Sequence, residues 1–116
     1  MTWTNWGRCE TAHPTEVLRP TTVQAVCDAV IRATATGRLI KVVGSGHSFT
    51  GIAVAPDIQL DLGALAGVLD VDRERKRVTV GGGTPLWQLT RLLARHGLAL
   101  ENMGDIDRQT ISGAIS

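Results

Sequence analysis

Apolar residues in the first third of the chain recur every three or four positions, the spacing that places side chains on one face of a helix. The residues in this series are Val23, Val26, Cys27, Val30 and Ile31. The series follows Pro-Thr-Thr at residues 20–22, a typical helix start, and it stops at Gly37. The pattern therefore predicts an amphipathic helix over residues 23–35, with Val26 and Val30 facing inward.

Short apolar runs follow the predicted helix and indicate strands. "LIKVV" (residues 39–43) predicts a buried strand that ends at a glycine-rich loop, and "IQLDL" (residues 58–62) alternates as a strand does. "VLDVD" (residues 68–72) and "VTVGGG" (residues 78–83) predict a hairpin across the charged turn from Arg73 to Arg77. We expect the middle of the chain to be mainly β-structure.

A second helix is predicted after this hairpin. Its apolar side carries Leu86, Leu89 and Leu93. We expect Thr84 as its N-cap, Pro85 at its first position and Gly97 at its end. Two helices and about four short strands, mixed in order, indicate an α+β fold.

Composition narrows the class of protein without identifying a function. The 116 residues suffice for one domain, and 43% hydrophobic with 20% charged residues is the ordinary globular range. A formal net charge of +1 indicates no strongly charged partner. The basic run at residues 73–77 is flanked by acidic residues and lacks aromatic neighbours, so a hairpin turn explains it better than nucleic-acid binding.

Targeting and metal signals are also weak. No apolar run approaches the ~20 residues of a membrane helix, and the first ten residues lack the order of a signal peptide. We therefore expect no membrane segment and a cytoplasmic location. Cys9 and Cys27 form no metal or redox motif, so we expect free thiols and no metal site.

The stretch "VVGSGHSFTG", residues 42–51, combines glycine, serine and histidine directly behind a predicted strand. A Rossmann fingerprint would need glycine where Phe49 stands, and a Walker A motif would need lysine and a hydroxyl residue at positions 52 and 53. Two interpretations stay open. Successive backbone N–H groups, helped by the hydroxyls of Ser45 and Ser48, can form an anion-binding concavity, or the stretch is a tight turn. A lone His47 adds little to either interpretation.

Four segments together resemble a known family. They are "NWGRCETAHPTEVLRPTTVQAV", "VVGSGHSFTGIA", "LDLGALAGVLDVDRERKRVTVGGGTPLWQL" and "HGLALENMGDIDRQTISGAIS". In this order they resemble the start of the vanillyl-alcohol oxidase superfamily, whose members carry a PCMH-type FAD-binding domain. Within it the sugar-1,4-lactone oxidases and the alditol oxidases are most similar.

The resemblance implies an α+β fold, namely the first subdomain of a PCMH-type FAD-binding domain, a short mixed sheet with flanking helices, plus the start of the second. We expect the first subdomain over residues 15–102 and the second to begin at residues 103–116. The substrate domain of the family would lie outside this chain. The chain alone is therefore expected to be inactive.

The resemblance also implies which residues bind FAD. The matching loop in the family cradles the FAD pyrophosphate through backbone N–H groups, and it corresponds to Val42, Val43, Gly44, Ser45, Gly46, His47 and Ser48. The residue matching His47 commonly bonds covalently to the flavin. By match, Asp105 and Thr110 would lie near the flavin, and Gly113 would let another backbone approach it. A polar loop entering a helix, capped by Asp107 or Thr110, is the other interpretation of this last segment. No catalytic residue and no metal ligand is assigned.

Two functions follow. One is a flavin-dependent oxidoreductase that oxidises a CH–OH group of a gulono- or arabinono-1,4-lactone by hydride transfer to FAD. Oxygen or an electron carrier would then be the acceptor. The alternative substrate class is an alditol, xylitol or sorbitol, as in the alditol oxidases. Asp105 stands where alditol oxidases tend to carry serine, which favours lactones. The other function is a truncated, non-catalytic nucleotide-binding module.

Overall fold

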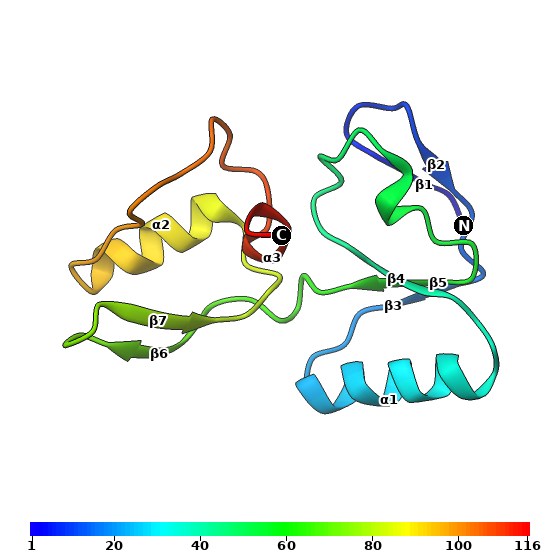
Figure 1. Cartoon of the computed structure of the whole chain (residues 1–116), viewed down its shortest axis with the longest axis horizontal. Coiled ribbons are helices and arrows are strands. Elements are labelled where there is room, and N and C mark those ends of the chain that lie inside the picture. The colour runs from blue at the N-terminus through cyan, green and yellow to red at the C-terminus, as the bar shows by residue number, and fades with distance from the viewer.

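Two groups of secondary-structure elements lie side by side along the longest axis of the computed structural model, which describes all 116 residues (Figure 1). The molecule measures 45 × 32 × 19 Å and its radius of gyration is 15.5 Å, whereas a compact domain of this length has about 13 Å. Only 16 of the 116 residues are buried. The chain is therefore drawn out along one axis, with much of its apolar surface accessible.

A three-stranded parallel sheet organises the first group. Its strands are β3 (Glu16–Leu18), β5 (Ile58–Asp61) and β4 (Ile40–Val43), in this spatial order. The central position of β5 explains why Ile58, Gln59 and Leu60 are buried in succession. The predicted strand at residues 58–62 is confirmed up to Asp61, but burial does not alternate along it.

The first helix, α1 (Val23–Ala35), has the predicted bounds and covers one face of this sheet (Figure 1). The Thr22 hydroxyl accepts a hydrogen bond from the Ala25 N–H at 3.1 Å and caps the helix start. The predicted inward position of Val30 is wrong, because 44% of that residue is exposed. Ala29 and Ala33, four residues apart, are buried instead, so the helix packs through its smallest side chains.

The prediction of a buried strand over residues 39–43 is only partly correct. β4 begins at Ile40, and Leu39 lies outside it with 60% of its surface exposed. Since β4 is an edge strand, Val43 alone among its residues is buried. The strand does end at the glycine-rich loop, as predicted.

The second group consists of a hairpin and a helix. β6 (Val68–Asp72) pairs antiparallel with β7 (Arg77–Val80), which confirms the predicted hairpin, but its second strand begins at Arg77 and ends before the glycines at residues 81–83. The helix α2 (Leu86–Arg95) buries the predicted leucines, Leu86, Leu89 and Leu93. Val78 and Val80 of β7 pack against them, so this group has its own small apolar core.

Thr84 is not the N-cap of α2 as predicted; Pro85 occupies that position. Thr84 is fully buried, and its hydroxyl donates to the carbonyl oxygen of Gly81 at 2.6 Å and accepts from the N–H of Gly67 at 2.9 Å. The first N–H groups of α2 donate instead to the carbonyl oxygens of Gln109 and Asp107. Neighbouring backbone therefore satisfies the start of this helix.

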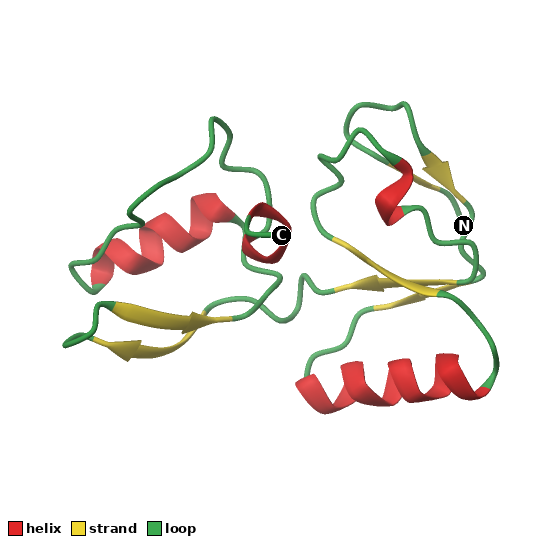
Figure 2. Ribbon diagram, viewed as in Figure 1, coloured by secondary structure: helices red, strands yellow, loops and turns green.

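Several short elements were not predicted. They are β1 (Trp3–Thr4), β2 (Thr11–Ala12), β3 and the 3-10 turn η1 (Gly51–Ala53). The short helix α3 (Ile111–Ala114) agrees with the interpretation of the last segment as a polar loop entering a helix, with Thr110 at the N-cap position. The mixture of helices and strands confirms the α+β prediction (Figure 2). The proposed division at residues 102 and 103 stays a prediction. None of the helices has the length and apolar character needed to cross a membrane.

Glu16 joins β3 to α1 and to the segment that follows it. Its carboxylate oxygens pair with Arg32 at 2.6 Å and with Arg38 at 2.9 Å. Hydrogen bonds from these two guanidinium groups hold the pKa of Glu16 below its ordinary value of 4.5. A lowered pKa means that the folded state favours the charged carboxylate, so this contribution is present above the ordinary value and is lost as pH falls through the lowered pKa.

We predict that Glu16→Gln lowers the thermal midpoint of the chain at pH 7 and that the gap to the wild type closes as pH falls below 4.5. Thermal unfolding between pH 7 and pH 3 measures this. Glu74→Gln is the matched control, because Glu74 is exposed and makes no ion pair. A gap of constant size across this range would contradict the prediction.

Candidate functional site

The glycine loop, defined as residues 44–49, starts at the carboxyl edge of the parallel sheet. β4 ends at Val43 and its partner β5 ends at Asp61, and these two residues are paired in register. Both strands leave the sheet at the same edge, where ligands commonly bind in open parallel sheets. The fold thus places this loop beside residues 61–63.

The glycine loop contains a run of backbone donors without partners, a feature that it shares with residues 99–110. The N–H groups of all six residues, 44–49, donate to no acceptor in the chain. Three of its carbonyl oxygens are engaged: Gly46 accepts from the Trp6 N–H at 2.7 Å, Ser48 from the Asn5 side chain at 2.9 Å, and Phe49 from the Cys9 thiol at 3.5 Å. Successive N–H groups in a turn can form an anion-binding concavity, and here the turn begins at the carboxyl edge of the sheet.

Gly46 lets the loop reverse its direction. Its φ is +71°, in the left-handed region that side chains with a Cβ atom rarely adopt. A Cβ atom there would also lie 3.1 Å from the Trp3 ring. Glycine is therefore required for the loop to keep this shape against the N-terminal residues.

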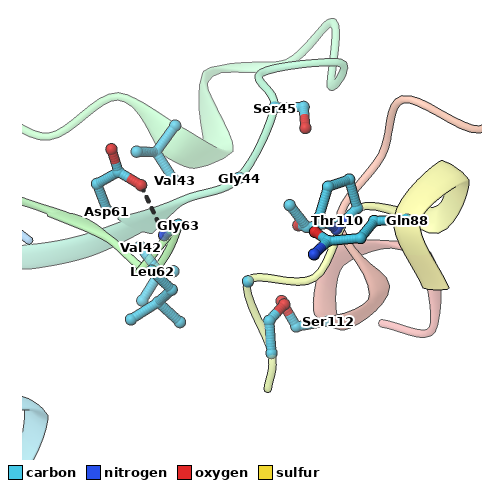
Figure 3. A pocket seen from close by; sticks show the side chains of 13 residues that line it. Val42, Val43, Gly44, Ser45, Asp61, Leu62, Gly63, Gln88, Thr110 and Ser112 are labelled. Carbon is cyan, nitrogen blue, oxygen red and sulfur yellow. Dashed lines mark hydrogen bonds between the residues drawn. The ribbon is translucent and has the colours of Figure 1, made fainter. Parts of the chain in front are cut away.

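A cavity of about 290 Å³ lies where the two groups of elements meet. Figure 3 shows Val43, Gly44 and Asp61 on one side of it and Gln88, Thr110 and Ser112 on the other. The full lining is Val42, Val43, Gly44, Ser45, Asp61, Leu62, Gly63, Gly82, Gly83, Pro85, Gln88, Thr110 and Ser112. The lining thus comes from both groups, and a ligand in the cavity would contact each of them.

Half of the predicted site residues line this cavity. They are Val42, Val43, Gly44, Ser45 and Thr110. Gly46, His47 and Ser48 continue the glycine loop outside the lining, while Asp105 and Gly113 are exposed on the C-terminal segment. The structure therefore does not bring Asp105 and Gly113 to the cavity.

Gly44 and Thr110 make the direct contact between the loop and the start of α3. A Cβ atom on Gly44 would lie 2.5 Å from the Thr110 hydroxyl oxygen. Thr110 occupies the N-cap position of α3, but its side chain makes no capping hydrogen bond. The hydroxyl thus keeps its donor and acceptor capacity at the cavity wall.

His47 packs against the N-terminal residues. Its ring stacks on Trp6, with 5.2 Å between centroids and 27° between planes, and Phe49 meets the same indole at 6.2 Å. Stacking on one face restricts how the imidazole can turn. His47 therefore has a defined orientation at the end of the loop opposite the cavity.

Sequence reasoning missed the cavity residues contributed by other segments of the chain. These are Asp61, Leu62, Gly63, Gly82, Gly83, Pro85, Gln88 and Ser112. The aspartate in "LDLG" and the "GGG" run, both directly behind strands, were the available signals. Asn5, which reaches Ser48 across 43 residues of sequence, had no such signal.

Asp61 is the only charged residue in the lining, and its charge is compensated. One carboxylate oxygen pairs with Arg19 at 3.1 Å, and the other accepts from the Gly63 N–H at 2.9 Å. Arg19 is largely exposed, so the pair is screened by solvent. The cavity nevertheless presents no unpaired carboxylate that would oppose an anion.

Comparison with known proteins identifies the family. A family model described as "FAD binding domain" matches residues 14–116. The chain belongs to this family. The match includes the glycine loop, every residue that lines the cavity, and all the elements from β3 onward, while β1 and β2 precede it.

Sequence relatives within the family have been named for their substrates. The chain is 42% identical over 112 residues to L-gulono-1,4-lactone dehydrogenase of Mycobacterium tuberculosis, covering 97% of this chain and 26% of the relative. It is 37% identical to L-gulonolactone oxidase of Mus musculus (96% and 25% covered) and 34% identical to D-arabinono-1,4-lactone oxidase of Eremothecium gossypii (97% and 22% covered). The chain spans about a quarter of the length of these curated relatives.

Solved structures support the same fold. Cholesterol oxidase from B. sterolicum matches with a TM-score of 0.81 at 22% identity, covering 97% of this chain and 22% of that one. Alkyldihydroxyacetonephosphate synthase matches with a TM-score of 0.76 at 20% identity, covering 84% and 20%. At these identities the likeness concerns the fold alone. Together with the family match, it confirms the predicted PCMH-type architecture.

The chemistry of the loop fits the cofactor for which the family is described. The pyrophosphate of FAD is a dianion that needs several hydrogen-bond donors. The six unpaired N–H groups at residues 44–49 provide them, and the compensated charge of Asp61 leaves the cavity side without opposing charge. Residues present in this chain therefore suit the phosphate part of FAD.

We predict that Gly44→Ala lowers the thermal midpoint of the chain by about 4 °C, because its methyl group meets the Thr110 hydroxyl and crowding of this kind costs about 1 kcal/mol or more. Adding Thr110→Ala removes that oxygen and should restore most of the loss, which a double-mutant cycle measures.

Gly104→Ala is the control for this cycle, because a Cβ atom at Gly104 meets nothing within 4 Å. Additive effects of the Gly44 and Thr110 substitutions would show that the two residues do not press on each other in solution.

Proposed function

We propose that this chain is the part of a flavin-dependent oxidoreductase that binds the phosphates of FAD, and that the whole protein oxidises a sugar 1,4-lactone. The observation that carries the proposal is the run of six unpaired N–H groups in the glycine loop, whose first two residues, Gly44 and Ser45, line the cavity. The family match supports FAD as the ligand, and the names of the sequence relatives support a lactone of the gulono or arabinono type as the substrate.

Each part of the site has a role in this proposal. The backbone of residues 44–48 would donate hydrogen bonds to the pyrophosphate. The Ser45 and Thr110 hydroxyls and the Gln88 amide line the cavity and would donate to neighbouring oxygens of the cofactor. The N–H donors belong to the backbone and have no side-chain freedom to lose, so they need less reorganisation than side-chain donors when the anion binds.

Flavin, when bound, supplies the group that accepts a hydride from a CH–OH carbon of the substrate. His47 is the residue that we propose for covalent attachment to the flavin. Its stacking on Trp6 supports this role, because a bond forms efficiently only when the reacting atoms are held in one orientation. Oxygen or an electron carrier would then accept the electrons, and a cytoplasmic location stays a prediction.

Purified full-length protein is predicted to be yellow and to contain FAD. It should reduce an acceptor dye when it is given L-gulono-1,4-lactone or D-arabinono-1,4-lactone, and much more slowly with xylitol or sorbitol. Turnover with the two alditols alone would assign the protein to the alditol oxidases. Full-length protein without flavin and without turnover would contradict the proposal and favour a non-catalytic module.

We predict that acid-precipitated full-length protein keeps fluorescent flavin and that His47→Ala releases it. Some activity should remain in the variant, because hydride transfer depends on where the ring is held rather than on the bond itself. Mass spectrometry of the intact protein measures the adduct. Flavin released from the wild type by acid would contradict covalent attachment while leaving FAD binding intact.

A further inference from the structure

The N-terminal strap, defined as residues 3–12, packs against the glycine loop. It contains β1, β2 and the turn between them, and β1 pairs with β2. The strap lies on the face of the three-stranded sheet opposite α1 (Figure 1). Its contacts with the loop involve Asn5 and Trp6, neither of which lines the cavity.

Asn5 is the buried centre of these contacts, with only 3% of its surface exposed. Its Oδ1 accepts from the N–H groups of Cys9 at 3.0 Å and Glu10 at 3.1 Å. Its Nδ2 donates to the carbonyl oxygen of Ser48 at 2.9 Å and to the Cys9 sulfur at 3.2 Å. Because Oδ1 faces two donors, the amide has one orientation, and Nδ2 must face the loop.

The strap engages the carbonyl oxygens of Gly46, Ser48 and Phe49, the last through the Cys9 thiol at 3.5 Å. The Trp6 N–H binds the Gly46 oxygen at 2.7 Å, and Asn5 Nδ2 binds the Ser48 oxygen. In a planar trans peptide the C=O and the following N–H point in opposite directions. Holding these two oxygens toward the strap therefore turns the N–H groups of His47 and Phe49 away from it.

We propose that Asn5 is a positioning residue for the pyrophosphate of FAD. By binding the Ser48 oxygen it fixes the plane of the Ser48–Phe49 peptide, so that this part of the loop presents the Phe49 N–H to the anion, beside the donors of residues 44–48, rather than a carbonyl oxygen. Without this bond the loop would have to order itself on binding, and that ordering would reduce affinity. The inference rests on the proposed function and adds a residue that has no contact with the cavity.

Asn5→Asp tests this role sharply. The carboxylate can still accept from Cys9 and Glu10, but it cannot donate to Ser48, and the thermal midpoint shows whether the strap stays folded with a charge at this buried position. Thr4→Asp is the matched control, because it adds the same charge one residue away, at an exposed position whose side chain contacts only Thr11 of the strap. Asn5→Ala removes the same donor without adding charge and serves as the second variant.

We measure how tightly the full-length apoprotein binds FAD and riboflavin, which lacks the phosphates. The thermal midpoint is measured alongside. If the flavin is covalently bound, every variant is made in the His47→Ala background so that the flavin can be removed to give the apoprotein. We expect the Kd of FAD to rise about tenfold in Asn5→Asp and in Asn5→Ala relative to Thr4→Asp, as the loss of one well-placed hydrogen bond predicts. The Kd of riboflavin should stay unchanged.

An unchanged Kd of FAD in both Asn5 variants would overturn the inference and leave the proposed function standing. Equal losses of FAD and riboflavin affinity, accompanied by a lower thermal midpoint, would also overturn it, because Asn5 would then only hold the fold together. Wild-type protein that binds no FAD would refute the proposed function itself, and the positioning role with it.

Discussion

The parallel pairing of β4 with β5 is the constraint on which the site depends. Pairing in register from Ile40 to Val43 makes both strands end at one edge, and β4 leaves the ladder there as an edge strand. The six residues that follow have no strand to pair with, so their N–H groups stay free. A donor-rich loop at the carboxyl edge of the sheet is the direct consequence, and the anion site follows from it.

Close approaches at glycines, where no Cβ atom intervenes, join the two groups of elements around this loop. Gly44 leaves room for the Thr110 hydroxyl, and a Cβ atom on Gly83 would collide with the Leu62 carbonyl oxygen. The cavity lies between these contacts and is lined from both groups. A ligand that binds there touches both groups at once, so its binding free energy would add to the stability of their junction. FAD would then be part of what holds this drawn-out chain together.

Sequence periodicity predicted the long elements and the loop but not the contacts that shape the site. The helix at residues 23–35 and the hairpin after Gly67 have enough residues to show their period. Two-residue strands such as β1 and β2 are too short to show a period, so the sequence could not predict the strap or the role proposed for Asn5. Val30 and Thr84 were misassigned because packing of small residues and tertiary hydrogen bonding decided their positions. Asp105 and Gly113 were placed near the cofactor by resemblance alone, and the cavity does not include them.

A crystal structure of the full-length protein with FAD tests the central claim most directly. The account predicts pyrophosphate oxygens about 2.7–3.2 Å from at least three backbone nitrogens of residues 44–48. It also predicts that the Gly46 and Ser48 oxygens still face the N-terminal strap. A pyrophosphate bound elsewhere, or a loop whose N–H groups donate to protein acceptors, would contradict it.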